Sequence, residues 1–220
     1  MEWTAYIDGY CERLEPGLTA EPLNALSNLA FLVAAFVMWP RVRGEGLGGA
    51  DALVGMLAVI GIGSLLFHTF ATVWAAAADV LPIGVFSLFY IYVANRSFLG
   101  LGRAWSLAGV LAFLPFAAVV SALLAPVPFV GISSFYWPLV IVIVGYAIWL
   151  RSRSPRAAQG LALGAAILTL SLIFRSLDMV GCTFWPMGTH FVWHLLNAVM
   201  LGWMIEVYRR HVLEAVKREG

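Results

Sequence analysis

The chain has 220 residues, of which 62% are hydrophobic and 11% are charged, and its formal net charge is +1. Soluble domains average roughly a quarter charged residues, so this composition and a mean hydropathy of +0.90 exclude an ordinary soluble domain and indicate a membrane protein. A net charge close to zero, without a long basic run, argues against a nucleic-acid partner. We expect one integral-membrane domain over residues 1–220, in contact with bilayer lipids and without an obligate protein partner.

Residues 1–22 form a polar, acidic segment in front of the first apolar run. This segment has neither the basic start nor the apolar core of a cleavable signal peptide. We expect a bundle of helices over residues 23–208 and a basic tail over residues 209–220.

Seven apolar segments are long enough to cross a bilayer, because a helix needs about 20 residues to span roughly 30 Å of hydrocarbon. They are approximately Leu23–Val42, Ala52–Phe70, Ala75–Ala94, Ala104–Leu124, Ser134–Leu150, Gly160–Leu177 and Met187–Tyr208. Alternation with period two is absent, which argues against a β-barrel. The sequence therefore predicts an all-α fold, a seven-transmembrane helix bundle.

The lysines and arginines predict how the bundle is oriented. Of the 13 basic residues, all except Arg13 and Arg175 follow the first, third, fifth or seventh segment. By the positive-inside rule, the C-terminus is cytoplasmic and the N-terminal segment lies on the outer side. We expect a multi-pass protein of a bacterial cytoplasmic membrane.

This orientation places three histidines at the same depth, on the non-cytoplasmic side. His190 and His194 are four residues apart, so on a helix they project from the same face, and His68 lies at the outer end of the second segment. Three histidines with an open fourth position are typical of catalytic zinc sites. The pair alone could equally be core or snorkelling histidines; the third histidine at the same depth favours a metal site.

Two further polar residues share this depth. Asp79, near the start of the third segment, could accept a proton from water and pass it to a leaving group. Ser64 lies one turn before His68 and could donate to a developing oxyanion, although an intramembrane serine often bonds to its own backbone instead. We therefore predict Asp79 and Ser64 as catalytic residues.

Asn197 and Arg175 are candidates for partners that orient the site from outside. Asn197 is three residues after His194 and could hold a metal ligand in place. Arg175 could pair with Asp79, since buried charges tend to be paired, or it could form a local pair with Asp178. The sequence leaves these two pairings open.

The order of these residues resembles the alkaline ceramidases, within a wider superfamily of seven-helix membrane hydrolases that includes progestin and adipoQ receptor-like proteins. The resemblance rests on Ser64-x3-His68-x10-Asp79-Val-Leu-Pro82, on His190-x3-His194, and on the opening motifs Tyr10-Cys11-Glu12 and Ala20-Glu21-Pro22-Leu-Asn24-Ala-Leu-Ser27-Asn28. It implies a zinc-dependent amidase that releases a fatty acid from the sphingoid base of ceramide. In such an enzyme His68, His190 and His194 hold zinc, Asp79 contacts the water on the metal, and Ser64 assists nearby.

The resemblance implies two more features of the N-terminal segment. The first is a disulfide between Cys11 and Cys182, and the predicted topology puts both cysteines on the outer, oxidising side. The second is a calcium site, since some family members bind calcium through acidic oxygens here, and calcium prefers oxygen ligands. Its candidate ligands are Asp8, Glu12, Glu15 and Glu21. The stretch between Glu12 and Glu21 is shorter than in the animal enzymes of the family, however, and Leu14 stands where an oxygen-bearing side chain would be wanted, so the acidic residues could simply be a solvated cap.

Other functions remain open at this stage. A hydrolase of another lipid amide or ester would share the metal chemistry, and only a panel of substrates separates the two. A heptahelical lipid receptor with structural zinc predicts ligand binding without turnover and no need for Asp79. A zinc transporter would need polar residues along the membrane path, but the inner halves of the predicted segments are almost wholly apolar.

Overall fold

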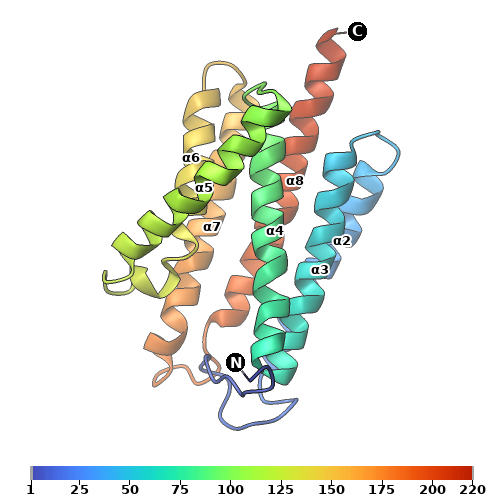
Figure 1. Ribbon diagram of the computed structural model, residues 1–220. Coiled ribbons are helices and arrows are strands. Elements are labelled where there is room, and N and C mark those ends of the chain that lie inside the picture. Colours follow the sequence, from blue (N-terminus) through green and yellow to red (C-terminus); the bar gives the residue numbers. More distant parts are fainter. Residues whose placement is uncertain (1, 220) are drawn as a thin grey trace.

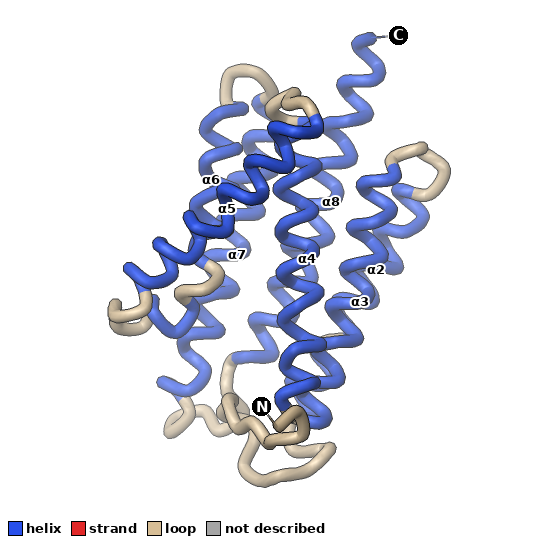
Figure 2. The backbone as a smooth tube through the Cα atoms, viewed as in Figure 1, coloured by secondary structure: helices blue, strands red, loops and turns tan. Residues whose placement is uncertain are grey.

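The computed structural model describes residues 2–219 and shows a bundle of helices joined by short loops (Figure 1). Within these residues no strand is formed (Figure 2), and the single isolated bridge joins Tyr6 to Thr72. The helices are α1 (Pro22–Ser27), α2 (Leu29–Val42), α3 (Gly48–Phe70), α4 (Val73–Ser97), α5 (Arg103–Leu124), the 3-10 helix η1 (Val130–Ser133), α6 (Trp137–Leu150), α7 (Pro155–Gly181) and α8 (His190–Glu219). The prediction of an all-α fold is confirmed.

Each predicted apolar segment corresponds to one of these helices, with α1 and α2 together forming the first. In the described part of the chain, six helices are long and apolar enough to cross a membrane, and α6 is a shorter apolar helix. The 14 residues of α6 extend about 21 Å at 1.5 Å per residue, which is less than the hydrocarbon thickness. Six spans are therefore established by length and composition, one fewer than the sequence predicts.

Prolines start some helices and lie inside others. A proline occupies the first turn of α1, α6 and α7, where its missing N–H would have no helical partner in any case. Pro40, Pro82 and Pro115 lie inside helices, which membrane helices tolerate better than soluble ones.

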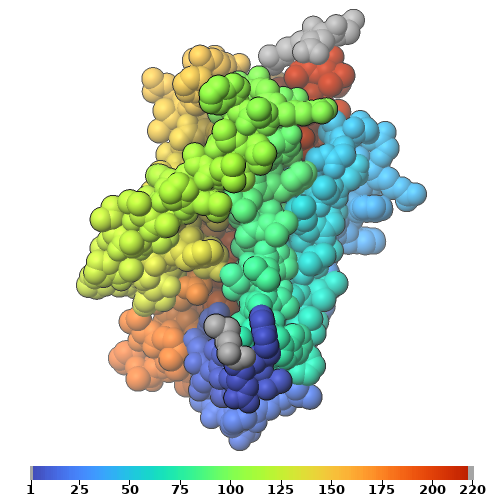
Figure 3. Space-filling model, viewed as in Figure 1, coloured from blue at the N-terminus to red at the C-terminus, as the bar shows by residue number. Residues whose placement is uncertain are grey.

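α8 lies at the centre of the bundle, where it packs against α1, α2, α3, α4 and α7. It continues without interruption from His190 to Glu219, so the basic tail predicted at residues 209–220 is part of this helix as far as the structure describes it. α5 is the least buried of the long helices and crosses the front face of the molecule (Figure 3). Its exposed apolar side chains, among them Trp105 and Leu123, form a surface suited to lipid.

The N-terminal segment closes the end of the bundle opposite the C-terminus (Figure 1). Its backbone pairs with the turn between α3 and α4: Ile7 N donates to Ala71 O at 2.8 Å, and Val73 N donates to Ala5 O at 3.1 Å. A disulfide joins Cys11 to Cys182, at the end of α7. The predicted disulfide is confirmed, and it fastens the segment across the end that carries the histidines.

Candidate metal centre

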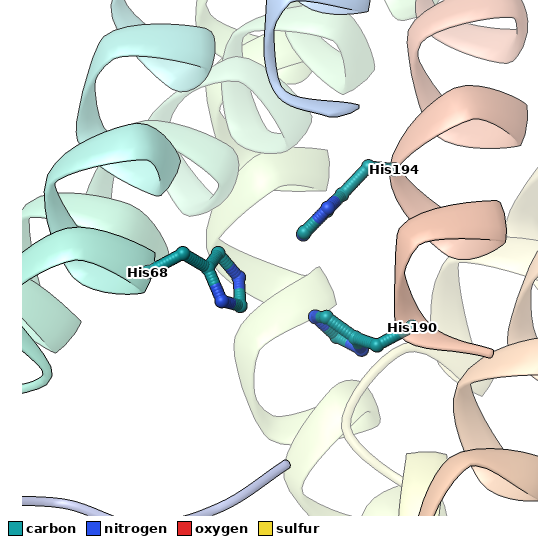
Figure 4. Close-up of side chains that lie close together, drawn as sticks. All are labelled: His68, His190 and His194. Atoms are coloured by element: carbon teal, nitrogen blue, oxygen red, sulfur yellow. The ribbon is translucent and has the colours of Figure 1, made fainter. Parts of the chain in front are cut away.

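Three buried histidines meet at this end of the bundle. His68 comes from the last turn of α3, and His190 and His194 come from the first two turns of α8; their rings point toward one another in Figure 4. One ligand nitrogen from each lies within 4.8 Å of the others. The three side chains are at most 1% exposed. Among the described residues, this is the group that could hold a metal ion.

The start of α8 is fixed by a carboxylate from α7. Asp178 Oδ1 accepts from the backbone N–H of Thr189 at 2.7 Å and of His190 at 2.9 Å, and its Oδ2 accepts from Cys11 N at 3.0 Å. A carboxylate in this place satisfies free helix N–H groups and complements the helix dipole. Gly188 makes the contact possible, because it has φ +64° and a Cβ there would lie 2.2 Å from Asp178 Oδ1.

Two polar side chains from the first helix and its N-cap hold the rings of His68 and His194. Glu21 Oε2 lies 2.6 Å from His68 Nδ1, and Ser27 Oγ lies 2.7 Å from His194 Nδ1. The Ser27 hydroxyl donates its hydrogen to Asn24 O at 2.9 Å. Since a carboxylate only accepts and a hydroxyl has one hydrogen, both imidazoles donate from Nδ1 and present Nε2 as a lone pair.

No hydrogen-bond donor in the described part of the chain faces these two lone pairs. His68 Nε2 and His194 Nε2 are buried and have no hydrogen-bond partner among the described residues. Buried polar atoms are normally satisfied, and a metal-bound histidine typically donates its other ring nitrogen to an outer acceptor. The residues present therefore fit a bound metal ion.

The third ring, that of His190, is held by stacking. The centroid of the Tyr10 ring lies 3.8 Å from that of His190, and the Trp193 ring lies 5.0 Å away, within 15° of parallel. Burial raises the pKa of the Tyr10 hydroxyl, so this residue stays neutral beside the histidines.

Glu21 is held as a carboxylate although it is buried. Burial alone would raise the pKa of Glu21, but hydrogen bonds from His68, Asn24 and Arg13 outweigh it and lower the pKa. Burial likewise works against the charge of Arg13, and its contact with Glu21 raises its pKa all the same. Glu21 thus remains a charged acceptor for the His68 ring.

Asp79 and Ser64 lie beside the histidines on α4 and α3. Both are buried, and their side chains lie within reach of one another. Neither Ser64 Oγ nor Asp79 Oδ1 has a hydrogen bond of normal geometry to any described residue. Ser64 does not return its hydroxyl to its own helix, which was the alternative reading of the sequence.

Close packing of α3 on α4 brings these two residues together. A Cβ on Gly63 would lie 2.0 Å from Ala78 O and 3.4 Å from the Cα of Asp79. Only glycine allows the two backbones to approach to this distance. Since Gly63 immediately precedes Ser64 and Ala78 immediately precedes Asp79, the contact sets their relative position.

The two predicted outer partners, Arg175 and Asn197, do not contact the histidines. Arg175 donates to Ile132 O at 2.7 Å and to Ser133 Oγ at 3.3 Å, and its guanidinium lies over the Tyr136 ring. The proposed local pair with Asp178 is wrong, because that carboxylate caps α8 instead. Asn197 faces an apolar cavity; Glu21 and Ser27 hold the rings in its place.

The four acidic residues considered for calcium do not gather into one site. Glu12 accepts from the backbone N–H of Leu23 at 2.7 Å and of Asn24 at 2.8 Å, which caps α1. Asp8 and Glu15 are exposed. Glu21 faces His68 and the guanidinium of Arg13. These residues do not fit a calcium ion.

An apolar cavity adjoins the histidines and extends along α8 toward the other end of the bundle. Its volume is about 60 Å³, and it is partly open to the surroundings. Trp193 and Asn197 line it next to His194, and Met204 lines its far part, about 16 Å further along the helix axis. The cavity therefore begins beside the histidines, although the histidines themselves are not part of its lining.

The fold and the site combine two features. A bundle with helices of membrane-spanning length carries three buried histidines that could hold a metal ion, beside a carboxyl and a hydroxyl. The chain matches the ceramidase family over residues 3–218, so it belongs to that family and is a ceramidase-like hydrolase. A comparison with curated proteins gives no match.

Sequence reasoning missed the roles of Ser27 and Arg13. Ser27 stands in one of the two opening motifs that carry the resemblance, and its spacing from Glu21 on a short helix could have indicated a shared role. Arg13 was visible as one of two basic residues on the outer side, but nothing in the sequence indicated that it is buried.

Proposed function

We propose that this protein is a zinc-dependent intramembrane amidase that hydrolyses the N-acyl bond of ceramide-like lipids to a sphingoid base and a fatty acid. The observation that carries the proposal is the meeting of three elements at one end of the bundle: histidine nitrogens without hydrogen-bond partners, a carboxyl oxygen and a hydroxyl that likewise lack them, and an apolar cavity whose lining includes Trp193, next to His194. Membership of the ceramidase family supports the substrate class.

His68, His190 and His194 would hold the ion. A zinc ion bound there supplies Lewis acidity and lowers the pKa of water toward 7. Neutral imidazole suits zinc, and the outer acceptors Glu21 and Ser27 keep the Nδ1–H tautomer of two of the rings. A carbonyl oxygen and a water molecule can therefore be polarised at one point in a site from which bulk water is excluded.

Asp79 and Ser64 divide the remaining chemistry. As the attacking water forms a C–O bond to the acyl carbon, Asp79 Oδ1 accepts one of its protons. Asp79 then donates this proton to the amide nitrogen as the C–N bond breaks. Ser64 Oγ–H donates to the oxyanion that develops on the former carbonyl oxygen. The products are a free amine and a carboxylic acid, so the water molecule is fully accounted for.

The apolar cavity would hold one hydrocarbon chain of the lipid. Its lining includes Phe31, whose ring centroid lies 6.2 Å from that of His194, and Tyr136 and Trp193 near the site. A chain that enters from the bilayer exchanges one apolar environment for another, so the cavity contributes packing contacts that hold the amide next to the histidines.

We further propose seven spans with the histidines toward the non-cytoplasmic side of the membrane. The helix α6 lies beside α7 in the bundle, and η1 extends it on the side of the site. The N-terminal segment and the end of α8 lie at opposite ends of the bundle (Figure 1), which agrees with an odd number of spans. The basic residues at or just after the ends of α2, α4 and α6, and in the C-terminal turns of α8, support a cytoplasmic C-terminus.

The test combines metal analysis with a fluorescent-ceramide assay on wild type and on Asp79→Asn. We expect about one zinc in each, with turnover in the wild type alone. A receptor with structural zinc predicts lipid binding by both proteins and turnover by neither. Cleavage of other lipid amides or esters in a substrate panel, with no cleavage of ceramide, would contradict the substrate and leave the metal site standing.

A further inference from the structure

Arg13 is a buried charge that the proposed chemistry does not use. It lies in the N-terminal loop, yet its side chain is 0% exposed. An unpaired charge in such a place costs several kcal/mol, so its surroundings must compensate for it.

The guanidinium joins three separate parts of the chain. Nε donates to Glu21 Oε1, Nη1 donates to Gly17 O at 3.1 Å, and Nη2 donates to His68 O at 3.1 Å. Arg13 therefore contacts His68 twice: directly at its backbone carbonyl, and through Glu21 at its imidazole Nδ1, 2.6 Å from Glu21 Oε2.

Glu21 has no freedom left once these contacts are made. One carboxylate oxygen faces the guanidinium, and the other accepts from His68 and, at 3.0 Å, from Asn24 Nδ2. The planar guanidinium makes its three bonds in fixed directions, with Nε on Glu21 and both Nη groups on backbone carbonyls, and the flexible ammonium group of a lysine cannot reproduce them. The direction in which Glu21 holds the imidazole is thus set by Arg13.

The family resemblance implies a calcium site in this N-terminal segment, but its four candidate acidic ligands do not face one common point. Glu21, the only buried one among them, already faces a permanent positive charge supplied by the chain itself. A second cation at this carboxylate would be repelled by the guanidinium.

We infer that Arg13 is a positioning residue that takes the place of a bound cation in the N-terminal segment, holding Glu21 and through it the ring of His68, so that the protein works without calcium. The inference rests on the proposed role of His68 as a metal ligand, but it does not depend on which lipid is cleaved. Its tests therefore use metal binding in the absence of substrate.

The first test concerns calcium. Wild-type protein loaded with zinc is exposed to a calcium-selective chelator or to added calcium in zinc-buffered solution. We expect no calcium in the metal analysis, no shift of the unfolding temperature, and no change in amide hydrolysis. One tightly held calcium per chain, or a loss of stability on its removal, would overturn the inference even if ceramide proves not to be the substrate.

The second test measures metal affinity by chelator competition, with cobalt as a spectroscopic probe. Loss of an outer partner of a metal ligand lowers affinity by about 10–100-fold, and we expect this for Arg13→Gln. Arg13→Lys should recover only part of the loss, because lysine keeps the charge and loses the fork. Arg153→Gln, a change of an exposed arginine at the opposite end of the bundle, is the matched control and should bind metal as the wild type does.

A double variant guards against misfolding caused by an unpaired buried charge. Arg13→Gln combined with Glu21→Gln removes both charges together, while the amide oxygen at position 21 can still accept from His68. If Arg13 acts through Glu21, the double variant binds metal no more weakly than Glu21→Gln alone. Wild-type affinity in folded Arg13→Gln, or losses that simply add in the double variant, would contradict the inference.

Discussion

The two ends of the bundle treat charge in opposite ways. At the histidine end, Arg13 pairs with Glu21, and their side chains are 0% and 2% exposed. At the other end, Arg156 pairs with Glu214, and their side chains are 88% and 34% exposed. Exposed pairs contribute little to stability, while a buried pair is strongly destabilising if one partner is lost.

This difference separates two uses of charged residues in one membrane protein. At the histidine end Arg13, Glu21 and Ser27 have fixed partners, and their contacts end on the Nδ1 atoms of His68 and His194. At the other end Arg156 and Glu214 pair at the surface, while the buried carboxylate of Glu206 is contacted by Arg209 and Arg210 of its own helix. The orientation in the membrane depends on how many basic residues lie at this end, and not on which residues they pair with.

The largest effect is expected for a change at the metal centre itself. His68→Ala removes one of three ligands and should reduce metal affinity by more than the roughly 10–100-fold that the loss of an outer partner costs, with loss of turnover. The control is His211→Ala, because His211 bonds to Ser97 O at the opposite end. Equal metal content in the two variants would break the distinction between the two ends.

A second prediction concerns the close approach of α3 and α4. Gly63→Ala places a Cβ 2.0 Å from Ala78 O, so the helices must separate, which should destabilise the fold by about 1–3 kcal/mol and displace Ser64 from Asp79. Gly55→Ala on the same helix meets nothing within 4 Å and serves as the control. The unfolding temperature and turnover are measured together; a Gly63→Ala protein as stable and active as Gly55→Ala would contradict the packing argument.

A smaller effect is expected for Ser27→Ala. The change removes the acceptor of His194 Nδ1 but leaves all three metal ligands, so metal affinity should fall by about 10–100-fold without loss of the fold. Metal affinity is measured by chelator competition, with Ser121→Ala as the control, since that hydroxyl bonds to Ser134 O on another part of the bundle. Wild-type affinity in Ser27→Ala would show that the ring needs no outer acceptor.

The smallest effect is expected at the exposed end. Arg156→Ala breaks the surface pair with Glu214 and should change the free energy of unfolding by less than about 1 kcal/mol. Chemical denaturation in detergent checks this value. A loss of stability as large as that of Gly63→Ala would mean that the two ends do not differ as described.

Much of this arrangement could be anticipated from particular residues. Hydropathy located most helix ends to within a few residues, although α8 continues beyond the predicted Tyr208 to Glu219. The spacing of His190 and His194 put both on one helix face. The outer-side position of Cys11 and Cys182 agreed with the disulfide that the family resemblance implied. Asn197 was misjudged, because a separation of three residues on a helix does not say which neighbouring helix or cavity a side chain meets.

The sequence by itself determined that the chain is a helical membrane protein and that its polar residues concentrate at one depth, because both follow from local hydropathy and helical periodicity. Only the tertiary structure decided which polar groups pair. Arg13, Glu21, Ser27 and Asp178 reach their partners across contacts between distant segments, and the N-terminal segment folds back over the histidines. Burial then makes each of those contacts obligatory, since water cannot satisfy the groups in their place.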